Sequence, residues 1–292
     1  MSIKPTLSVP LFDGEVSMHA FGCEHACNFS FKGIDTSPLP RSTHKEIFAA
    51  LASIPSRASY YAPSPVQMNA EVLTRAGAYN TTRKSWARRR KAMPYGTYTL
   101  HRCGFADGLS GLHEHTGYVM SAADCALVVA KNGDLVIAAH AGRNSIINMQ
   151  AMKGGSPRRH ESVVHSIREK VEEVGLRFPE THVWVGFSIS AGPHFAHAFS
   201  DPRNPQNKTM VEYVTKSYGA SCFKEDGQGG TQGWLDTKEL IRRQFVTLGV
   251  PEEHVELDSI CTYSDMVKGD YTWYSNVRSG EKRNLVAVVV NQ

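Results

Sequence analysis

Residues Thr116–Ser145 read TGYVMSAADCALVVAKNGDLVIAAHAGRNS, and the fold is decided in this stretch. Two apolar runs, Ala126–Ala130 and Leu135–Ala139, flank a turn at residues 131–134 with the sequence Lys-Asn-Gly-Asp. Asn-Gly between β-forming segments is the strongest short-range signal for a hairpin. The stretch therefore predicts two antiparallel strands joined by a tight turn.

The ends of this hairpin carry a cysteine and a histidine. Cys125 precedes the first apolar run and His140 follows the second, so antiparallel pairing would bring the thiol and the imidazole together at the open end. A pair of this kind suits either a metal site or a thiolate–imidazolium nucleophile. The residues of the hairpin alone leave both chemistries open.

The composition is that of an ordinary globular protein. The chain has 292 residues, of which 41% are hydrophobic and 21% charged, and its formal net charge is +4. Six cysteines in a chain of this length favour reduced thiols over a disulfide scaffold. The N-terminus lacks the apolar core of a signal peptide, and no apolar run approaches the roughly 20 residues that span a bilayer. We expect a cytoplasmic protein with no membrane partner.

Strand and helix patterns alternate along the chain without a linker, which predicts one α+β domain over residues 1–292. Amphipathic helices are predicted at His160–Val174 and Leu235–Leu248, the second with a capping box that starts at Asp236. Strands are predicted at Val183–Ser190 and at Leu285–Val290; the latter is continuously apolar and so belongs inside a sheet. Residues 1–93 are the least readable part, and 94–292 carry the motifs.

Two features of the first third have ordinary explanations. The basic segment 83–91 is more often a solvated face than a nucleic-acid site, although it could contact a protein partner. Cys23 and Cys27 flank His25, but no second pair of ligands follows, so two plain thiols are favoured over structural zinc.

Further histidines and an arginine lie close to the hairpin in sequence. A strand predicted at Tyr95–Leu100 ends at His101, and His113 and His115 precede the hairpin, so these three are candidates for a third metal ligand. After His140, a helix capped by Asn144 or Ser145 would begin beside Arg143. Such a helix start is suited to an anion.

The order of motifs resembles the laccase-domain, or polyphenol-oxidase-like, family, which is understood as zinc-dependent purine nucleoside phosphorylases. The matching motifs are Ala123-Asp124-Cys125, His140-Ala141-Gly142, Gly192-Pro193, Leu235-Asp236 with Phe245 to Val250, Cys261-Thr262, and Trp273-Tyr274-Ser275-Asn276-Val277-Arg278 with Arg283. They run from about Tyr95 to the C-terminus.

The resemblance implies a single domain with mixed β-sheets between outer helices, in a four-layer α/β/β/α arrangement. It also implies one zinc ion with three protein ligands and an open position, held by Cys125, His140 and an upstream histidine. The family's Gln-Val-His-Gly motif is missing, so we take His101 as that ligand, with His113 and then His115 as substitutes.

The implied reaction is phosphorolysis of a purine nucleoside such as inosine, adenosine or guanosine, with inorganic phosphate as co-substrate; deamination of adenosine is a second implied activity. Catalytic roles would fall on Cys125, His140 and Asp124. Cationic partners for phosphate would be Arg143, Arg278 and Arg283, and Tyr274 or Trp273 would stack on the purine. The family's Trp-Arg-Gly after His-Ala-Gly is replaced by Arg143-Asn144-Ser145, so the pocket wall differs.

Two rival interpretations remain. The fold also resembles that of cytotoxic necrotising factor-type deamidases, which need no metal; Cys125 would then be the nucleophile and His140 the base. The chain could instead be a non-enzymatic relative that binds a partner through residues 83–91. Metal content distinguishes the first rival from the zinc enzyme.

Overall fold

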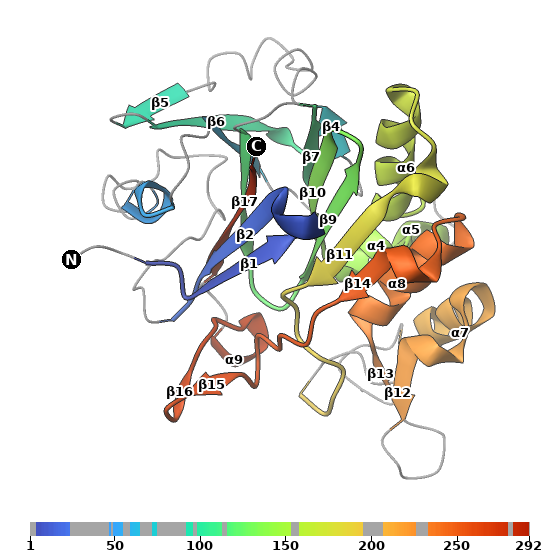
Figure 1. The fold of residues 1–292 in the computed structure, drawn as a ribbon. Helices are drawn as coiled ribbons and strands as arrows, with labels where there is room; N and C mark the ends of the chain where they lie inside the picture. Colours follow the sequence, from blue (N-terminus) through green and yellow to red (C-terminus); the bar gives the residue numbers. More distant parts are fainter. Residues whose placement is uncertain are drawn as a thin grey trace.

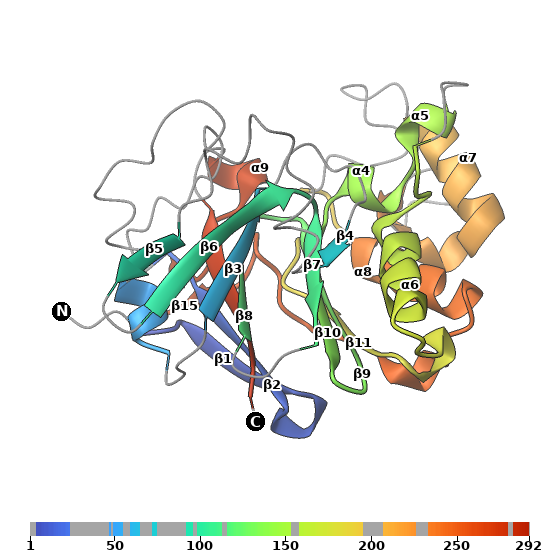
Figure 2. The same ribbon diagram turned by 90° about the horizontal axis from the view of Figure 1, so that it is seen from above.

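Two β-sheets lie face to face in the computed structural model of the chain, with helices on their outer sides (Figures 1 and 2). The structure describes residues 4–23, 47, 49–54, 59–64, 72–74, 92–95, 98–112, 116–152, 158–194, 207–225, 233–279 and 283–291. The basic segment 83–91, His25, Cys27, His113 and His115 lie outside these residues.

The first sheet, called sheet A, contains seven strands among the described residues. In spatial order they are β1 (Leu7–Leu11), β2 (Val16–Phe21), β17 (Asn284–Val290), β8 (Thr116–Ala122), β3 (Ser59–Ser64), β6 (Tyr98–Phe105) and β5 (Ala92–Tyr95). The last strand of the chain, β17, lies between β2 and β8. This confirms that the apolar run near the C-terminus is an interior strand.

The second sheet, sheet B, contains six strands among the described residues. Their order is β14 (Val255–Leu257), β11 (His182–Gly186), β9 (Ala126–Asn132), β10 (Leu135–Ala141), β7 (Gly108–Gly111) and β4 (Val72–Thr74). Two small ribbons complete the strands of the described part: β12 (Phe223–Glu225) with β13 (Gly233–Leu235), and β15 (Met266–Val267) with β16 (Asp270–Tyr271). Strands from the first 93 residues thus belong to both large sheets.

Helices cover the outer face of sheet B, as Figure 2 shows. They are α4 (Arg143–Ile146), α5 (Met149–Met152), α6 (Val163–Glu173), α7 (Asn207–Tyr218) and α8 (Thr237–Thr247); α9 (Asn276–Ser279) lies apart, next to β15 and β16 (Figure 1). Short 3-10 turns stand at Phe12–Gly14, Phe178–Glu180, Ala220–Cys222 and Glu252–His254. No helix in the described part of the chain is long and apolar enough to cross a membrane.

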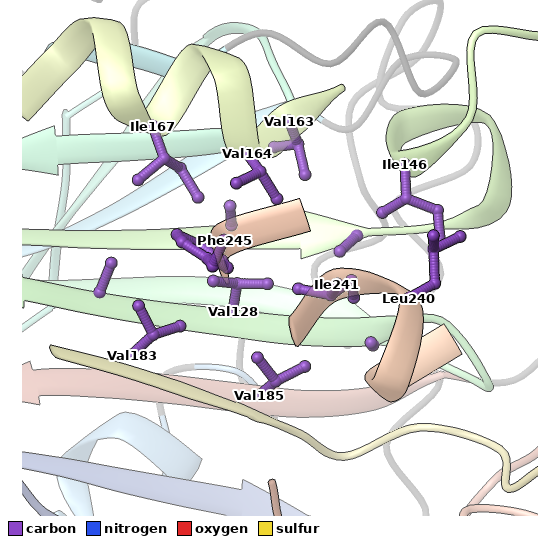
Figure 3. Close-up of a cluster of buried hydrophobic side chains, with 14 of the residues drawn as sticks. Val128, Ile146, Val163, Val164, Ile167, Val183, Val185, Leu240, Ile241 and Phe245 are labelled. Atoms are coloured by element: carbon purple, nitrogen blue, oxygen red, sulfur yellow. The ribbon is translucent and has the colours of Figure 1, made fainter. Parts of the chain in front are cut away.

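Three hydrophobic clusters separate the layers. The cluster between the sheets includes Met18 and Tyr118 from sheet A and Val129 and Trp184 from sheet B. The cluster on the helix side of sheet B is drawn in Figure 3; it includes Val128, Ile146, Val163, Val164, Ile167, Val183, Val185, Leu240, Ile241 and Phe245. A strand buried on both faces reads as a continuous apolar run, which explains Ala126–Ala130.

The third cluster lies on the outer face of sheet A. Ile47, Leu51 and Ile54 pack there against strand residues such as Val119 and Ala287, and residues 47 and 49–52 are helical. The layers are therefore helix, sheet A, sheet B and helices. This confirms the four-layer α/β/β/α arrangement expected from the sequence.

The central hairpin is confirmed with one correction at its turn. β9 and β10 pair with Leu135 opposite Asn132, so the two turn residues are Gly133 and Asp134 and not Asn132 and Gly133. Gly133 has a φ of 53°, as the first turn residue of a type II′ hairpin requires. Asn132 is buried, and its amide donates to the Arg177 carbonyl at 2.9 Å and the Thr181 hydroxyl at 3.1 Å. Its side chain therefore fixes the base of the turn.

Several other boundaries differ from those predicted. The strand predicted at Tyr95–Leu100 is the hairpin of β5 and β6, with Tyr95 opposite Tyr98, so His101 lies inside a strand and not at its end. Helix α6 is shorter than His160–Val174, and Val174 is 39% exposed. Gly175 ends the helix with a φ of 79°, as predicted.

Helix α8 confirms the predicted capping box. The Asp236 carboxylate accepts a hydrogen bond from the Glu239 backbone N–H at 3.1 Å. Leu240, Ile241 and Phe245 are fully buried against sheet B. The helix is thereby fixed at its start by its cap and along its length by its apolar stripe.

The close packing of β7 against β10 leads to a stability prediction. A methyl group on Gly108 would lie 2.6 Å from the Ala139 Cβ and 2.7 Å from the Ala138 carbonyl oxygen. We expect Gly108→Ala to lower the free energy of unfolding by about 2 kcal/mol, measured by urea denaturation. Val174→Ala, at a half-exposed position, is the control and should change it by less than about 0.5 kcal/mol. Equal effects of the two substitutions would contradict the packing described.

Candidate active site

The chain passes from sheet A to sheet B twice at the same end of the two sheets. β6 and β8 both pair with β3 in parallel, so both end at the same edge of sheet A. After β6 the chain enters β7 through Ala106 and Asp107, and after β8 it enters β9 through residues 123–125. Asp107 and Cys125 therefore lie at two neighbouring crossings.

Cys125 and His140 meet at this end, as the sequence predicted. β9 and β10 pair with His140 opposite Leu127 and Ala141 opposite Ala126, so Cys125 lies just beyond the last pair, two residues from the partner of His140. The His140 side chain is 13% exposed. Burial acts to lower the pKa of His140, but the neighbouring Cys125 and Asp107 outweigh it and raise that pKa to about 10. The imidazole is therefore held between the Cys125 thiol and the Asp107 carboxylate.

Asp107 is a third member of the site that the sequence did not reveal. Its carboxylate, 1% exposed, has Oδ1 at 3.8 Å from His140 Nδ1, which is longer than a normal hydrogen bond but close for an ion pair. The Asp107 carbonyl also accepts a hydrogen bond from the His140 backbone N–H at 2.8 Å. An aspartate after a predicted strand was visible in the sequence, but its neighbour was not, because only the pairing of β7 with β10 brings the two together.

Arg143 places a positive charge beside the thiol. It is the first residue of α4, and its side chain is half-buried. Burial lowers the pKa of Arg143, and the neighbouring Cys125 opposes this shift. The N-cap is Gly142, so Asn144 and Ser145 lie within the helix and the predicted cap at these residues is wrong. α4 has four residues, and the charge near Cys125 comes from the arginine side chain.

Arg158 is a second cation near the site, and no sequence motif pointed to it. Its guanidinium donates to the carbonyls of His160 at 2.7 Å and Ser145 at 3.3 Å, and also to Asn144 and Glu161. Burial lowers the pKa of Arg158, while the negative charges of Glu161 and Asp107 act against the shift. Arg158 therefore holds α4 in place and adds positive charge on the side of Asp107.

Asp124 fixes the turn that presents Cys125. It has a φ of 75°, a conformation that is costly for a residue other than glycine. Its Oδ1 accepts from the Thr262 hydroxyl at 2.8 Å; its Oδ2 accepts from the Ser275 hydroxyl at 3.0 Å and the Val277 backbone N–H at 2.8 Å. Both carboxylate oxygens are thus engaged, which favours a positioning role over the catalytic role expected from the sequence.

Cys261 adds a further link between the C-terminal segment and the site. Its backbone forms an isolated parallel β-bridge with that of Ser188. Its Sγ accepts a hydrogen bond from the Ser190 backbone N–H at 3.4 Å. Burial acts to raise the pKa of Cys261, but hydrogen bonds from Ser264 and Ser190 outweigh it and lower that pKa. The Ile189 N–H donates to the Asp124 carbonyl at 3.0 Å. The Cys-Thr motif therefore braces the turn before Cys125.

The aromatic residues predicted to stack on a substrate are buried. Trp273 is 3% exposed and packs edge-on against Phe187, with ring centroids 4.7 Å apart. Tyr274 is 8% exposed, its hydroxyl donates to the Cys23 carbonyl at 3.4 Å, and its N–H donates to Asn284 Oδ1 at 2.8 Å. Both rings are buried in the interior of the protein. The described contacts therefore give no support to the expected stacking of Trp273 or Tyr274 on a purine.

The two C-terminal arginines predicted to bind phosphate contact other groups of the protein. The Arg278 guanidinium donates to the carbonyls of Tyr263 and Trp273 and lies over the Tyr271 ring, 3.5 Å from its centroid. Arg283 donates to Asn276 Oδ1 at 3.1 Å. Arg278 therefore clamps the β15–β16 ribbon, and of the three predicted arginines Arg143 is the one beside the Cys125–His140 pair.

The predicted third metal ligand, His101, stays a prediction, and only its backbone position is described. Strand pairing aligns His101 with Tyr61, and Tyr61 with Tyr118, in the middle of sheet A. Phe105, at the end of β6, is about 13 Å further along the strand. The register therefore argues against His101, whose side chain lies outside the described part of the structure.

The other candidate histidines, His113 and His115, lie outside the described residues altogether. The strand before them, β7, runs from Gly108 opposite Ala139 to Gly111 opposite Val136, away from His140. Among the described residues, no group of three or more His, Cys, Asp or Glu side chains is placed to hold a metal. Cys125 and His140 are thus two potential metal ligands, and the described residues supply no third ligand beside them.

Comparison with known families and structures agrees with this architecture. The family model for multi-copper polyphenol oxidoreductase laccase matches residues 62–290. A search of curated proteins finds no match. Similar solved structures include Bacillus licheniformis hypothetical protein YfiH, with 15% identity, coverage of 94% of this chain and 93% of that one, and a TM-score of 0.64.

Two further solved structures share the fold. Neisseria meningitidis protein NMB0706 is 17% identical, with 98% of this chain and 99% of that one covered and a TM-score of 0.61. YlmD from Geobacillus stearothermophilus is 18% identical, with 95% and 92% covered and a TM-score of 0.62. At such identities the structures establish the fold alone. The function has to be inferred from the residues of this chain.

The hydrogen bonds of Asp124 give a test of its role. Asp124→Ala would leave the donors of Thr262, Ser275 and Val277 without their acceptor, so we expect a loss of about 3 kcal/mol in the free energy of unfolding. Thr262→Ala removes one of the three bonds and should cost about 1 kcal/mol. If Asp124→Ala left the urea unfolding curve unchanged, the hydrogen bonds of the Asp124 carboxylate would not stabilise the fold.

Proposed function

Because the chain belongs to the family described as multi-copper polyphenol oxidoreductase laccase, and because its motifs resemble those of the nucleoside phosphorylases of this fold, we propose that it is an enzyme that cleaves purine nucleosides with inorganic phosphate. The observation that carries the proposal is the convergence of Cys125, His140 and Arg143 at one end of the sheets. These are the residues to which the motifs assign the metal and the phosphate.

The reaction needs a cation for the nucleophile. A phosphate oxygen forms a bond to C1′ of the ribose while the bond from C1′ to the purine nitrogen breaks, and the proton that the phosphate gives up passes to the leaving purine. Arg143 would hold the phosphate, because a half-buried guanidinium binds an oxyanion through two parallel hydrogen bonds. Arg158 is engaged with backbone carbonyls, so its charge supports this end of the site without binding the substrate.

The donor chemistry of Cys125 and His140 fits zinc. A thiolate and an imidazole are common zinc ligands, and metal-ligating histidines usually have a carboxylate behind the ring, where Asp107 lies at 3.8 Å from Nδ1. A catalytic zinc has three protein ligands, so one donor is required in addition to these two. When bound, the metal would act as a Lewis acid on a substrate or water oxygen.

The activity is tested with inosine in the presence and absence of phosphate. We expect release of hypoxanthine and formation of ribose 1-phosphate only when phosphate is present, and a loss of at least about a hundredfold in kcat/KM for Cys125→Ala and His140→Ala. With adenosine, release of adenine indicates phosphorolysis, and formation of inosine indicates the second implied activity, deamination.

Matched variants locate the phosphate contact. Arg143→Lys should raise KM for phosphate by roughly tenfold because a point charge replaces a planar fork, and Arg278→Lys should leave KM unchanged. Cys222→Ala, in the helix-side core, is the thiol control and should remain active. Hydrolysis at the same rate without phosphate, or no release from any purine nucleoside, would overturn the proposal.

Metal content gives a readout that does not depend on activity. We expect purified protein to contain near-stoichiometric zinc by atomic emission, and Cys125→Ala and His140→Ala to lose it. Asp107→Asn should weaken zinc affinity by about 10- to 100-fold, as is usual for a group that orients a ligand. Zinc retained by both Cys125→Ala and His140→Ala would place the metal elsewhere.

A further inference from the structure

A serine, an imidazole and a second serine form a hydrogen-bonded row across β1 and β2 of sheet A. The Ser8 hydroxyl lies 2.9 Å from His19 Nδ1, and the Ser17 hydroxyl lies 3.1 Å from His19 Nε2. Ser8 is exposed on the edge strand β1, whereas His19 is 7% exposed. A hydroxyl open to solvent is therefore backed by a buried ring, which is the arrangement of a nucleophile and its base.

The row lies on the face of sheet A that is turned away from sheet B. Met18 and Ala20, which alternate with His19 along β2, belong to the cluster between the sheets. Since successive side chains of a strand point to opposite faces, Ser17 and His19 project outward. Ser8 is directly opposite His19 in the β1–β2 pairing, so it projects to the same face. The row is thus separate from the site described above.

The hydrogen bonds of the row run in one direction. Asn291 Nδ2 donates to the Gly14 carbonyl at 2.9 Å, and Asn291 Oδ1 accepts the Ser17 proton at 3.3 Å. A hydroxyl has one proton to give, so the Ser17 oxygen accepts from His19 Nε2–H. Burial lowers the pKa of His19, so near neutral pH the ring is uncharged and Nδ1 carries a lone pair. That lone pair accepts the Ser8 proton.

The edge of sheet A leaves a backbone donor next to the Ser8 hydroxyl. The Asn291 N–H donates to the Glu15 carbonyl at 2.8 Å, in register with the β17–β2 pairing. Hydrogen-bonded and non-hydrogen-bonded pairs alternate along an antiparallel ladder, so the His19 backbone bonds β17 and not Ser8. Ser8 therefore directs its own N–H out of the edge strand. A backbone N–H beside the attacking oxygen stabilises the negative oxygen of an acyl-transfer transition state.

We propose that Ser8 is a nucleophile that takes acyl groups from small esters with a good leaving group, such as aryl esters and thioesters, with His19 as its base and Ser17 as a positioning residue. The class of substrate follows from the base. A ring whose pKa is lowered by burial is a weak base, so amides, whose leaving group is poor, are excluded.

The proposed reaction balances with water as the only co-reactant. The Ser8 oxygen forms a bond to the acyl carbon while the bond from that carbon to the leaving oxygen or sulfur breaks. The Ser8 proton passes through His19 Nδ1 to the leaving group. Water then attacks the new ester, and its proton passes through His19 back to the Ser8 oxygen. The net products are a carboxylic acid and an alcohol or a thiol.

The test uses the full chain with p-nitrophenyl acetate, quenched in acid and analysed by mass spectrometry that assigns the acetyl group to a residue. We expect Ser8 to be acetylated at least about a hundredfold faster than Ser221, an exposed serine with no imidazole contact in the described part of the chain. His19→Gln should lower the rate at Ser8 by about a hundredfold. Ser162→Ala is the matched control and should leave that rate unchanged, because Ser162 also lies 2.9 Å from an imidazole, that of His165, but is fully buried.

Two measurements distinguish a positioning role of Ser17 from a loss of folding. Ser17→Ala should lower the rate at Ser8 by about tenfold while urea unfolding remains cooperative, and Ser17→Thr, which keeps the hydroxyl, should restore most of the rate. Nitrogen NMR shifts of the His19 ring should show the Nε2–H tautomer in the wild-type chain and a mixture of tautomers in Ser17→Ala. The proposal is overturned if Ser8 is acetylated no faster than Ser221. It is equally overturned if His19→Gln or Ser17→Ala reacts at the wild-type rate.

Discussion

The turn from Ala123 to Cys125 is the constraint on which the site depends. Within it the chain leaves sheet A and enters sheet B, and Asp124 takes up a φ of 75° that costs about 1 kcal/mol or more. Hydrogen bonds from Thr262, Ser275 and Val277 to its carboxylate offset this cost. The last third of the chain therefore holds in place a residue that the middle third contributes.

A second crossing gives the site its other half. At the end of β6 the chain again passes between the sheets, and it leaves Asp107 against His140. His140 itself is placed by the pairing of β9 with β10, whose faces are both buried. A thiol, an imidazole and a carboxylate thus come from three different segments: His140 lies within β10, while Cys125 and Asp107 immediately precede β9 and β7. This rigidity suits either a metal ligand set or a nucleophile, because both need fixed geometry.

The sequence revealed those parts of the site whose position is set by residues nearby in the chain. The hairpin, and with it the meeting of Cys125 and His140, follows from two apolar runs and a turn. Asp107 could not be identified, because its contact depends on which strand lies beside β10. The contacts of Arg278 were hidden for a related reason: its guanidinium donates to carbonyls of the C-terminal segment, and no sequence pattern distinguishes such an arginine from an anion ligand. The place of His101 depends on strand register, which sets it in the middle of sheet A, opposite Tyr61.

The central claim is that Asp107 and His140 act as one coupled unit. A double-mutant cycle with Asp107→Asn and His140→Gln, read as the free energy of unfolding in the presence of a chelator, tests it most directly. The geometry predicts a coupling energy above about 0.5 kcal/mol, since the two groups face each other at 3.8 Å in a nearly dry environment. Effects that add within about 0.3 kcal/mol would contradict the coupling and with it the description of the site.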